Sequence, residues 1–123
     1  MEYKGFRDLK VYQLSYKLAL EIFEITKLYP KEELYSLTDQ IRRSSRSVPS
    51  NIAEAWRRRK YVKSFVNKLT DSLTEESETE VWLDFSRDFH YISIEKYDYF
   101  IGKYDEVARM LSSMIDNPDK FCN

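Results

Sequence analysis

The chain has 123 residues and a net charge of −1, a length that fits one domain with a single core. Its one cysteine, Cys122, excludes an internal disulfide and leads us to expect a cytoplasmic protein. No apolar run is long enough to span a membrane and the charged N-terminus is unlike a signal peptide, so we expect no membrane partner.

Apolar residues recur at helical spacing in four segments. These segments cover about residues 6–29, 36–60, 62–90 and 94–116. Pro30 ends the first helix, Ser36 with Asp39 predicts a cap on the second, and Ser93 predicts a cap on the fourth. Four helices with short connections predict an all-α, antiparallel up-down four-helix bundle that forms one domain over residues 1–123.

The third helix has an interrupted pattern. Residues 74–80 are polar, and we interpret their carboxylates as a solvated face or as partners for a neighbour's arginines. Its inner face is predicted to consist of Val62, Val66, Leu69, Leu73, Ser77, Val81, Phe85 and Phe89.

A proline lies inside the second helix. Pro49 removes one backbone hydrogen bond, at a cost of about 3 kcal/mol if nothing compensates. Nearby serine hydroxyls can bond to freed carbonyls, so we expect a kink at Val48 and Pro49.

Charge is unevenly distributed along the chain. Residues 31–70 carry ten basic and four acidic side chains, a net charge of +6, whereas residues 71–123 carry five and thirteen, a net charge of −8. At about 100° per residue, the basic residues of the second helix flank its apolar face. Guanidinium groups bond to two phosphate oxygens at once, so these residues form a candidate nucleic-acid site. The candidates are Arg42, Arg43, Arg46, Arg57, Arg58, Lys60 and Lys63.

The same charges have a second interpretation. A row of charges on a helix is usually a solvated face, and the acidic third and fourth helices offer partners within one molecule or between subunits. Against this, Glu54 alone interrupts the positive charge between Arg42 and Lys68.

Catalytic patterns are weak, and we expect neither an enzyme nor a metal or other cofactor. His90 is the only histidine and is predicted to mark the end of the third helix. The glutamates of residues 75–80 lack the Glu-x-x-His pattern of di-iron bundles, no glycine-rich phosphate loop is present, and Cys122 has no nearby base.

Three blocks carry a family resemblance: FRDLKVYQLS (residues 6–15), LTDQIRRSSRSVPSNIAEA (37–55) and ETEVWLDFSRD (78–88). With these the chain resembles the four-helix bundle proteins encoded by intervening sequences in bacterial large-subunit ribosomal RNA genes. It is similar also to the accessory protein of diversity-generating retroelements, a basic pentameric bundle that associates with a reverse transcriptase and nucleic acid. The resemblance implies an antiparallel bundle that assembles into a ring, commonly a homopentamer, and no biochemical activity is established for the wider family. Ala55 stands where the family usually has glycine, which predicts a more continuous end to the second helix.

Aromatic content also indicates an oligomer. Ten Tyr, seven Phe and two Trp exceed what one small core requires, and aromatic residues are enriched at interfaces. For any single tyrosine, a ring that covers the bundle with its hydroxyl in water is the simpler explanation. The candidate interface residues are Trp56, Arg59, Trp82, Tyr91 and Tyr99.

Two functions remain open at this point. The first is a module that binds RNA, or another nucleic acid, by phosphate contacts. The second is an oligomeric scaffold whose basic face binds an acidic protein partner or the acidic helices of a neighbouring subunit.

Overall fold

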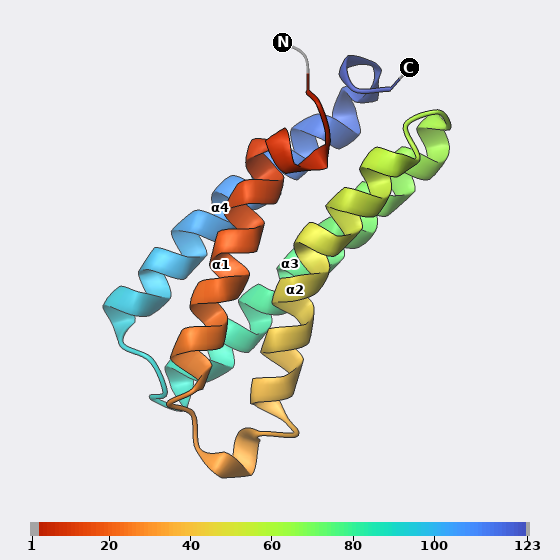
Figure 1. The fold of residues 1–123 in the computed structure, drawn as a ribbon. Coiled ribbons are helices and arrows are strands. Elements are labelled where there is room, and N and C mark those ends of the chain that lie inside the picture. Colours follow the sequence, from red (N-terminus) through yellow and green to blue (C-terminus); the bar gives the residue numbers. More distant parts are fainter. Residues whose placement is uncertain (1–2, 123) are drawn as a thin grey trace.

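The computed structural model describes residues 3–122 and confirms an all-α four-helix bundle (Figure 1). Four long helices and three short 3-10 helices account for most of these residues, and no strand occurs among them. The long helices are α1 (Lys10–Thr26), α2 (Leu37–Arg57), α3 (Val62–Asp88) and α4 (Ile94–Asp116). The short ones are η1 (Phe6–Asp8), η2 (Lys31–Glu33) and η3 (Pro118–Lys120).

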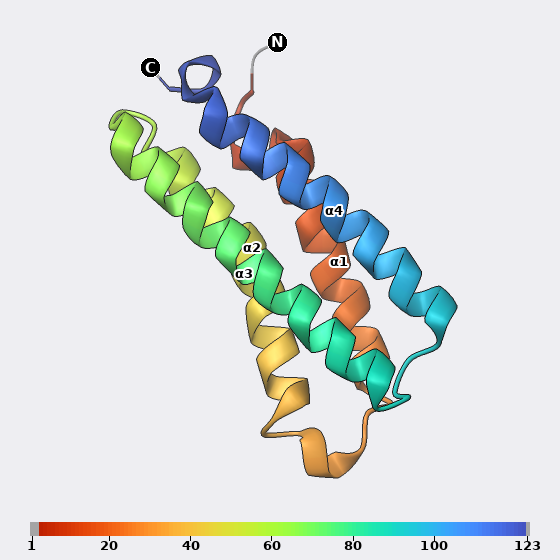
Figure 2. The same ribbon diagram turned by 180° about the vertical axis from the view of Figure 1, so that it is seen from behind.

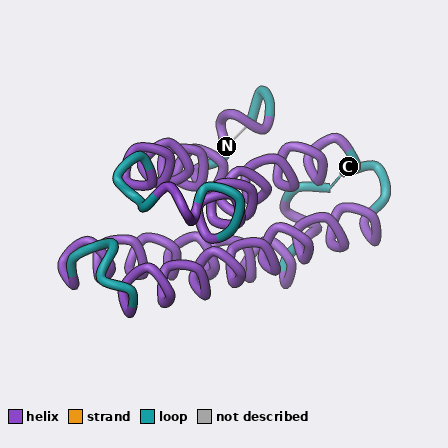
Figure 3. The backbone as a smooth tube through the Cα atoms, turned by 90° about the horizontal axis from the view of Figure 1, so that it is seen from below, coloured by secondary structure: helices purple, strands orange, loops and turns teal. Residues whose placement is uncertain are grey.

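The helices alternate in direction along the bundle. Consecutive helices pack against each other, and α1 also packs against α4 (Figure 2). Both termini lie at the end of the bundle where α2 connects to α3, and Tyr3 stacks on Phe121 there with ring centres 6.0 Å apart. Loops join the helices (Figure 3), and the longest of these connections, residues 27–36, contains η2. Within the described residues, no helix combines the length and apolar character needed to cross a membrane.

Local chemistry sets the helix ends. The Ser93 hydroxyl accepts a hydrogen bond from the Lys96 amide at 3.0 Å, which confirms the predicted cap of α4. Ser36 is the N-cap residue of α2, as predicted, but its side chain makes no capping hydrogen bond. The carboxylate of Glu33 accepts from the Leu37 amide instead, at 3.3 Å. The first helix begins later than predicted, since η1 and the extended Leu9 precede it.

His90 ends α3 in a left-handed conformation, with φ of 63°. The Tyr91 amide donates to the Ser86 carbonyl at 2.9 Å, and the His90 amide donates to the Arg87 carbonyl at 3.0 Å. These two bonds form a Schellman motif, in which glycine is the usual residue at the left-handed position. The prediction that His90 marks the end of the third helix is therefore confirmed.

Helix α2 is continuous through Pro49, and the predicted kink is not confirmed. The hydroxyls of Ser45 and Ser47 donate to the carbonyls of Arg42 and Arg43, one turn earlier. The Val48 carbonyl accepts from the Ser72 hydroxyl of α3 at 2.8 Å. All three accepting carbonyls lie on the N-terminal side of Pro49, within about two turns of it.

The predicted inner face of α3 is wrong for most of its residues. Of that set only Leu69 is buried, and Val62, Val81, Phe85 and Phe89 are 45–50% exposed. The true inner face combines three large apolar side chains with small polar ones and one carboxylate. It consists of Phe65, Leu69, Ser72, Glu76, Thr79, Leu83 and Ser86.

Hydroxyl groups join α3 to the rest of the bundle. Thr79 lies 2.8 Å from the Ser44 hydroxyl of α2, and Ser86 accepts from the Tyr29 hydroxyl at 2.7 Å. The Ser72–Val48 bond is the third such contact. Because each hydroxyl has a partner, these polar residues occupy a buried interface without the usual penalty of an unpaired group. The apolar core lies beside them and includes Leu18, Ile22, Ile41, Ile52, Phe100, Tyr104 and Leu111.

Candidate nucleic-acid interface

The predicted basic residues lie at several places on and beside α2. Because α2 ends at Arg57, Arg58 and Lys60 belong to the connection to α3, and Lys63 lies in the first turn of α3. Arg42 is half-buried, and the remaining six side chains are exposed. We call these six the basic surface: Arg43, Arg46, Arg57, Arg58, Lys60 and Lys63.

At the α2 N-terminal half, the cations gather around an aromatic ring of α1. Arg42 donates from Nε to the Thr26 hydroxyl at 2.8 Å, and its guanidinium lies 4.6 Å from the centre of the Phe23 ring. The Arg46 guanidinium lies 5.6 Å from the same ring. Arg42 therefore helps to hold α1 against α2 as well as adding charge. An open hollow of about 530 Å³ borders this cluster, and Asp39 is its one acidic lining residue.

A second hollow lies at the other end of α2, with a volume of about 470 Å³. The N-terminal segment forms one wall, and the end of α2 forms the other. The guanidinium of Arg7 lies 4.5 Å from the centre of the Phe6 ring, and that of Arg57 lies 5.8 Å from it. Five cationic side chains and no carboxylate line this hollow. They are Lys4, Arg7, Arg57, Arg59 and Lys60.

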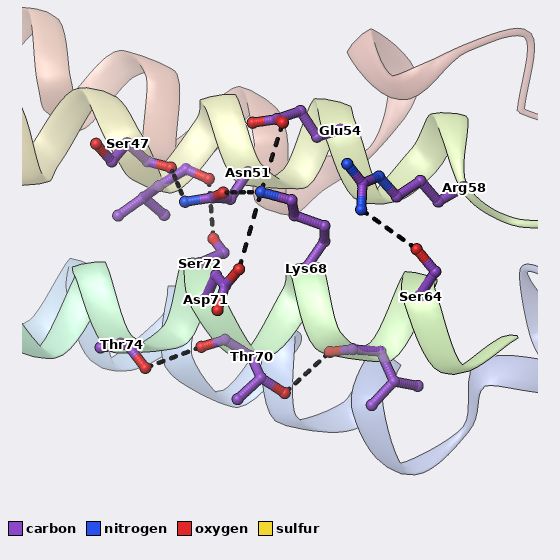
Figure 4. A network of polar contacts seen from close by, with 12 residues as sticks. Ser47, Asn51, Glu54, Arg58, Ser64, Lys68, Thr70, Asp71, Ser72 and Thr74 are labelled. Atoms are coloured by element: carbon purple, nitrogen blue, oxygen red, sulfur yellow. Dashed lines mark hydrogen bonds and ion pairs between the residues drawn. The ribbon is translucent and has the colours of Figure 1, made fainter. Parts of the chain in front are cut away.

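The basic surface is free of ion pairs within residues 3–122. Lys68 behaves differently, because its ammonium group contacts the carboxylates of Glu54 at 3.5 Å and Asp71 at 3.8 Å (Figure 4). Arg58 has only the Ser64 hydroxyl as a partner in this network, at 3.4 Å. The charges of the basic surface thus remain available to an external anion.

The residues predicted at a subunit interface have varied surroundings. Trp56 is buried within its own chain, where the Arg59 guanidinium lies 3.7 Å from its ring centre. Trp82 and Tyr91 are half-buried, and Tyr99 is 38% exposed. Their role in an interface stays a prediction.

Trp82 and Tyr91 lie at the two ends of an aromatic row on the outside of α3. The ring centres of Trp82 and Phe85 are 6.0 Å apart, those of Phe85 and Phe89 are 5.8 Å apart, and those of Phe89 and Tyr91 are 5.6 Å apart. We call Val81, Phe85 and Phe89, which are four positions apart, the outer face of α3.

One carboxyl group of the acidic run is inside the bundle. Glu76 is 1% exposed, and one of its carboxyl oxygens has no hydrogen-bond partner among the described residues. Burial raises the pKa of Glu76 to about 9, with contributions from Glu80 on the same helix and Asp105 on α4. Burial also raises the pKa of Tyr104, whose hydroxyl has no partner among these residues either. Within residues 3–122 no cluster of three or more His, Cys, Asp or Glu could hold a metal.

Sequence reasoning missed several of these residues. Glu76 lies in a run of polar residues, and only its spacing from Leu69 and Leu83, seven positions each way, gives a signal for the inner face. The contribution of Lys4 and Arg7 to a basic hollow depends on how the N-terminal segment folds against α2, for which the sequence carries no signal.

Comparisons with known proteins agree with this fold. The family model described as 23S rRNA-intervening sequence protein matches residues 7–113. The chain is also similar to a crystal structure from Bacteroides thetaiotaomicron, described as a protein with unknown function from the S23 ribosomal protein family. The two are 32% identical, the match covers 86% of this chain and 95% of that one, and the TM-score is 0.78. No curated protein matches the chain.

Proposed function

Since the chain belongs to the 23S rRNA-intervening sequence protein family, we propose that it is a non-enzymatic, homo-oligomeric four-helix bundle that binds RNA through its basic surface. The observation that carries this proposal is the absence of ion pairs at the basic surface within residues 3–122. A positively charged helix face that served only for solubility would more often mix charges of both signs.

The dimensions of the surface support phosphate contacts. Arg43 and Arg57 lie about 21 Å apart along the axis of α2, at about 1.5 Å per residue. This distance spans several phosphates of a nucleic-acid backbone. Contacts to phosphate carry little sequence information, so we expect broad specificity and a strong dependence on salt.

The proposal is tested by measuring RNA affinity at a series of salt concentrations. The variant Arg43→Glu/Arg58→Glu/Lys60→Glu reverses three exposed charges that form no ion pair within residues 3–122. We expect the affinity to fall at every salt concentration, and the slope of log K against log salt to decrease by about two to three.

A matched control separates a local effect from a change in net charge. Lys96→Glu/Lys103→Glu/Arg109→Glu makes the same charge change on α4 and should bind RNA far better than the test variant. Equal losses in the two variants, or no loss in the first, contradict the proposal. If the wild type binds no RNA and the test variant loses its oligomer, the basic surface instead serves contacts between subunits or with an acidic protein.

The outer face of α3 supports the oligomeric part of the proposal. Its three apolar side chains are 45–50% exposed, and grouped exposed apolar residues mark interaction surfaces. We expect Phe85→Ser/Phe89→Ser to lower the molar mass measured by sedimentation while helix content is kept. The control Leu28→Ser/Tyr35→Ser changes residues that are 87% and 92% exposed elsewhere and should keep the wild-type mass. An unchanged mass in the first variant contradicts this surface.

A further inference from the structure

Aromatic side chains of α1 form a row beside the basic surface. Tyr12, Tyr16 and Phe23 are four and seven positions apart, a spacing that places them on one face of the helix. The rings of Tyr12 and Tyr16 are stacked with centres 5.8 Å apart, and Phe6 meets Tyr12 edge-on at 5.1 Å. Tyr16 is 50% exposed, so part of its ring is open to solvent.

This row borders α2 directly. Tyr16, Leu20 and Phe23 of α1 line a hollow of about 370 Å³ together with Arg46 and Pro49 of α2. Arg46 also lines the larger hollow described above, so the two are adjacent. The rings of Tyr16 and Phe23 and the guanidinium of Arg46 therefore line one groove between α1 and α2, and Arg46 connects this groove to the basic hollow.

Cations lie at both ends of the aromatic row. At one end, Lys27 joins Arg42 and Arg46 around Phe23, with its ammonium group 5.1 Å from the ring centre. At the other end, Arg7 and Arg57 flank Phe6. Arg46 and Arg57 are about 17 Å apart along α2, which is the length of about five nucleotides stacked at about 3.4 Å each.

We propose that this groove binds single-stranded nucleic acid, with a base stacked on the Tyr16 ring, which Tyr12 supports from the other face, and phosphates bound by the cations at both ends. The inference rests on the proposed function and specifies its ligand as single-stranded nucleic acid. A duplex keeps the faces of its bases stacked inside the helix, so it can offer phosphates to the cations but no base to the tyrosines. A single strand offers both, and a charged groove with stacking aromatic rings is the general solution for binding one.

The test compares a single-stranded uridine oligomer of about ten nucleotides with an RNA duplex of the same length. We expect Tyr16→Leu to weaken single-strand binding by about 5- to 150-fold, the effect of removing one base–aromatic stack. Tyr16→Phe keeps the ring and should bind like the wild type. Tyr12→Leu should also weaken single-strand binding, and all variants should bind the duplex equally.

The control variant Ile94→Ala removes an exposed apolar side chain from α4 and should leave both affinities unchanged. Because Tyr16 lies at the surface, its substitution leaves the core intact, and circular dichroism verifies this. If the wild type prefers the duplex, or if Tyr16→Leu and Tyr12→Leu bind the single strand like the wild type, the stacking groove is refuted and the proposed function stands. If the wild type binds neither the single strand nor the duplex, both the stacking groove and the proposed function are refuted.

Discussion

Replacing Glu76 with glutamine should change how the stability of the bundle depends on pH. Glu76 is 1% exposed, and its pKa in the folded protein is raised to about 9 because burial disfavours the carboxylate. In the unfolded chain the ordinary value is 4.5. Between these values the folded protein holds a proton that the unfolded chain releases. The free energy of unfolding should therefore fall as pH rises from about 4.5 to 9, and level off above that.

The size of the change in the free energy of unfolding follows from the difference between the two pKa values. At about pH 7.5 the unfolded carboxyl group is about three pH units above its pKa, which corresponds to about 4 kcal/mol at about 1.4 kcal/mol per unit. Coupling to Glu80 and relaxation around the carboxyl group reduce this figure, so we expect about 2 to 4 kcal/mol. Glu76→Gln keeps the shape of the side chain and cannot ionise. Its free energy of unfolding should therefore not show the fall with pH that Glu76 causes in the wild type.

The assay is urea unfolding followed by far-ultraviolet circular dichroism across this pH range, for the wild type and Glu76→Gln. Near pH 4.5 the two proteins should be about equally stable, and near pH 8 the variant should be more stable by about 2 to 4 kcal/mol. Titratable groups remote from Glu76 contribute equally in both proteins, so their contributions cancel in the difference. Parallel pH profiles for the two proteins would refute the reasoning, because they would show that Glu76 ionises in the folded state as it does in the unfolded chain.

Three further substitutions have predictable effects on stability. His90→Gly should raise the free energy of unfolding by about 1 kcal/mol, since glycine adopts the left-handed conformation without strain, whereas His90→Ala should not. Tyr29→Phe should lower it by about 1 to 2 kcal/mol, because it removes the buried hydrogen bond to Ser86. Ser93→Ala should cost about 1 kcal/mol by leaving the Lys96 amide without its cap, and Ser93→Asp should restore most of the loss. Thermal and urea unfolding measure all three, and a change of opposite sign in any of them contradicts its explanation.

The sequence predicts the four helices because their apolar spacing and breaking residues are strong local signals. Pro30 and Ser93 act within one or two turns, so their effects can be predicted without knowing what packs nearby. The inner face of α3 could not be predicted in this way. Large apolar side chains lie on both sides of this helix, as Phe65 and Phe85 illustrate, and periodicity does not say which side meets the core.

The candidate site, too, could be predicted from the sequence only in part. That the basic residues near α2 are exposed could be predicted, since they flank an apolar face whose direction was clear. The bond of Arg42 to Thr26 and the position of Arg46 beside Tyr16 depend on how closely α1 approaches α2. Contacts between elements far apart in the chain leave no local sequence pattern, so only the structure shows the aromatic side of the groove.

The hydroxyl contacts between α3 and its neighbours fix the axial register of the bundle. Apolar surfaces can slide past one another with little loss, whereas the bonds Ser44–Thr79, Ser72–Val48 and Tyr29–Ser86 form in one alignment. A slip by one helical turn, about 5.4 Å, would leave three buried hydroxyl contacts unmade. Ser44, Thr79 and Ser86 also donate to carbonyls of their own helices, and these bonds would survive the slip. At a net value of about 0.5 to 1.5 kcal/mol for each lost contact, the slip would cost roughly 1.5 to 4.5 kcal/mol, a large part of the stability of a domain this size. The small polar residues of α3 thus select one alignment of the helices, which an all-apolar interface would leave less sharply defined.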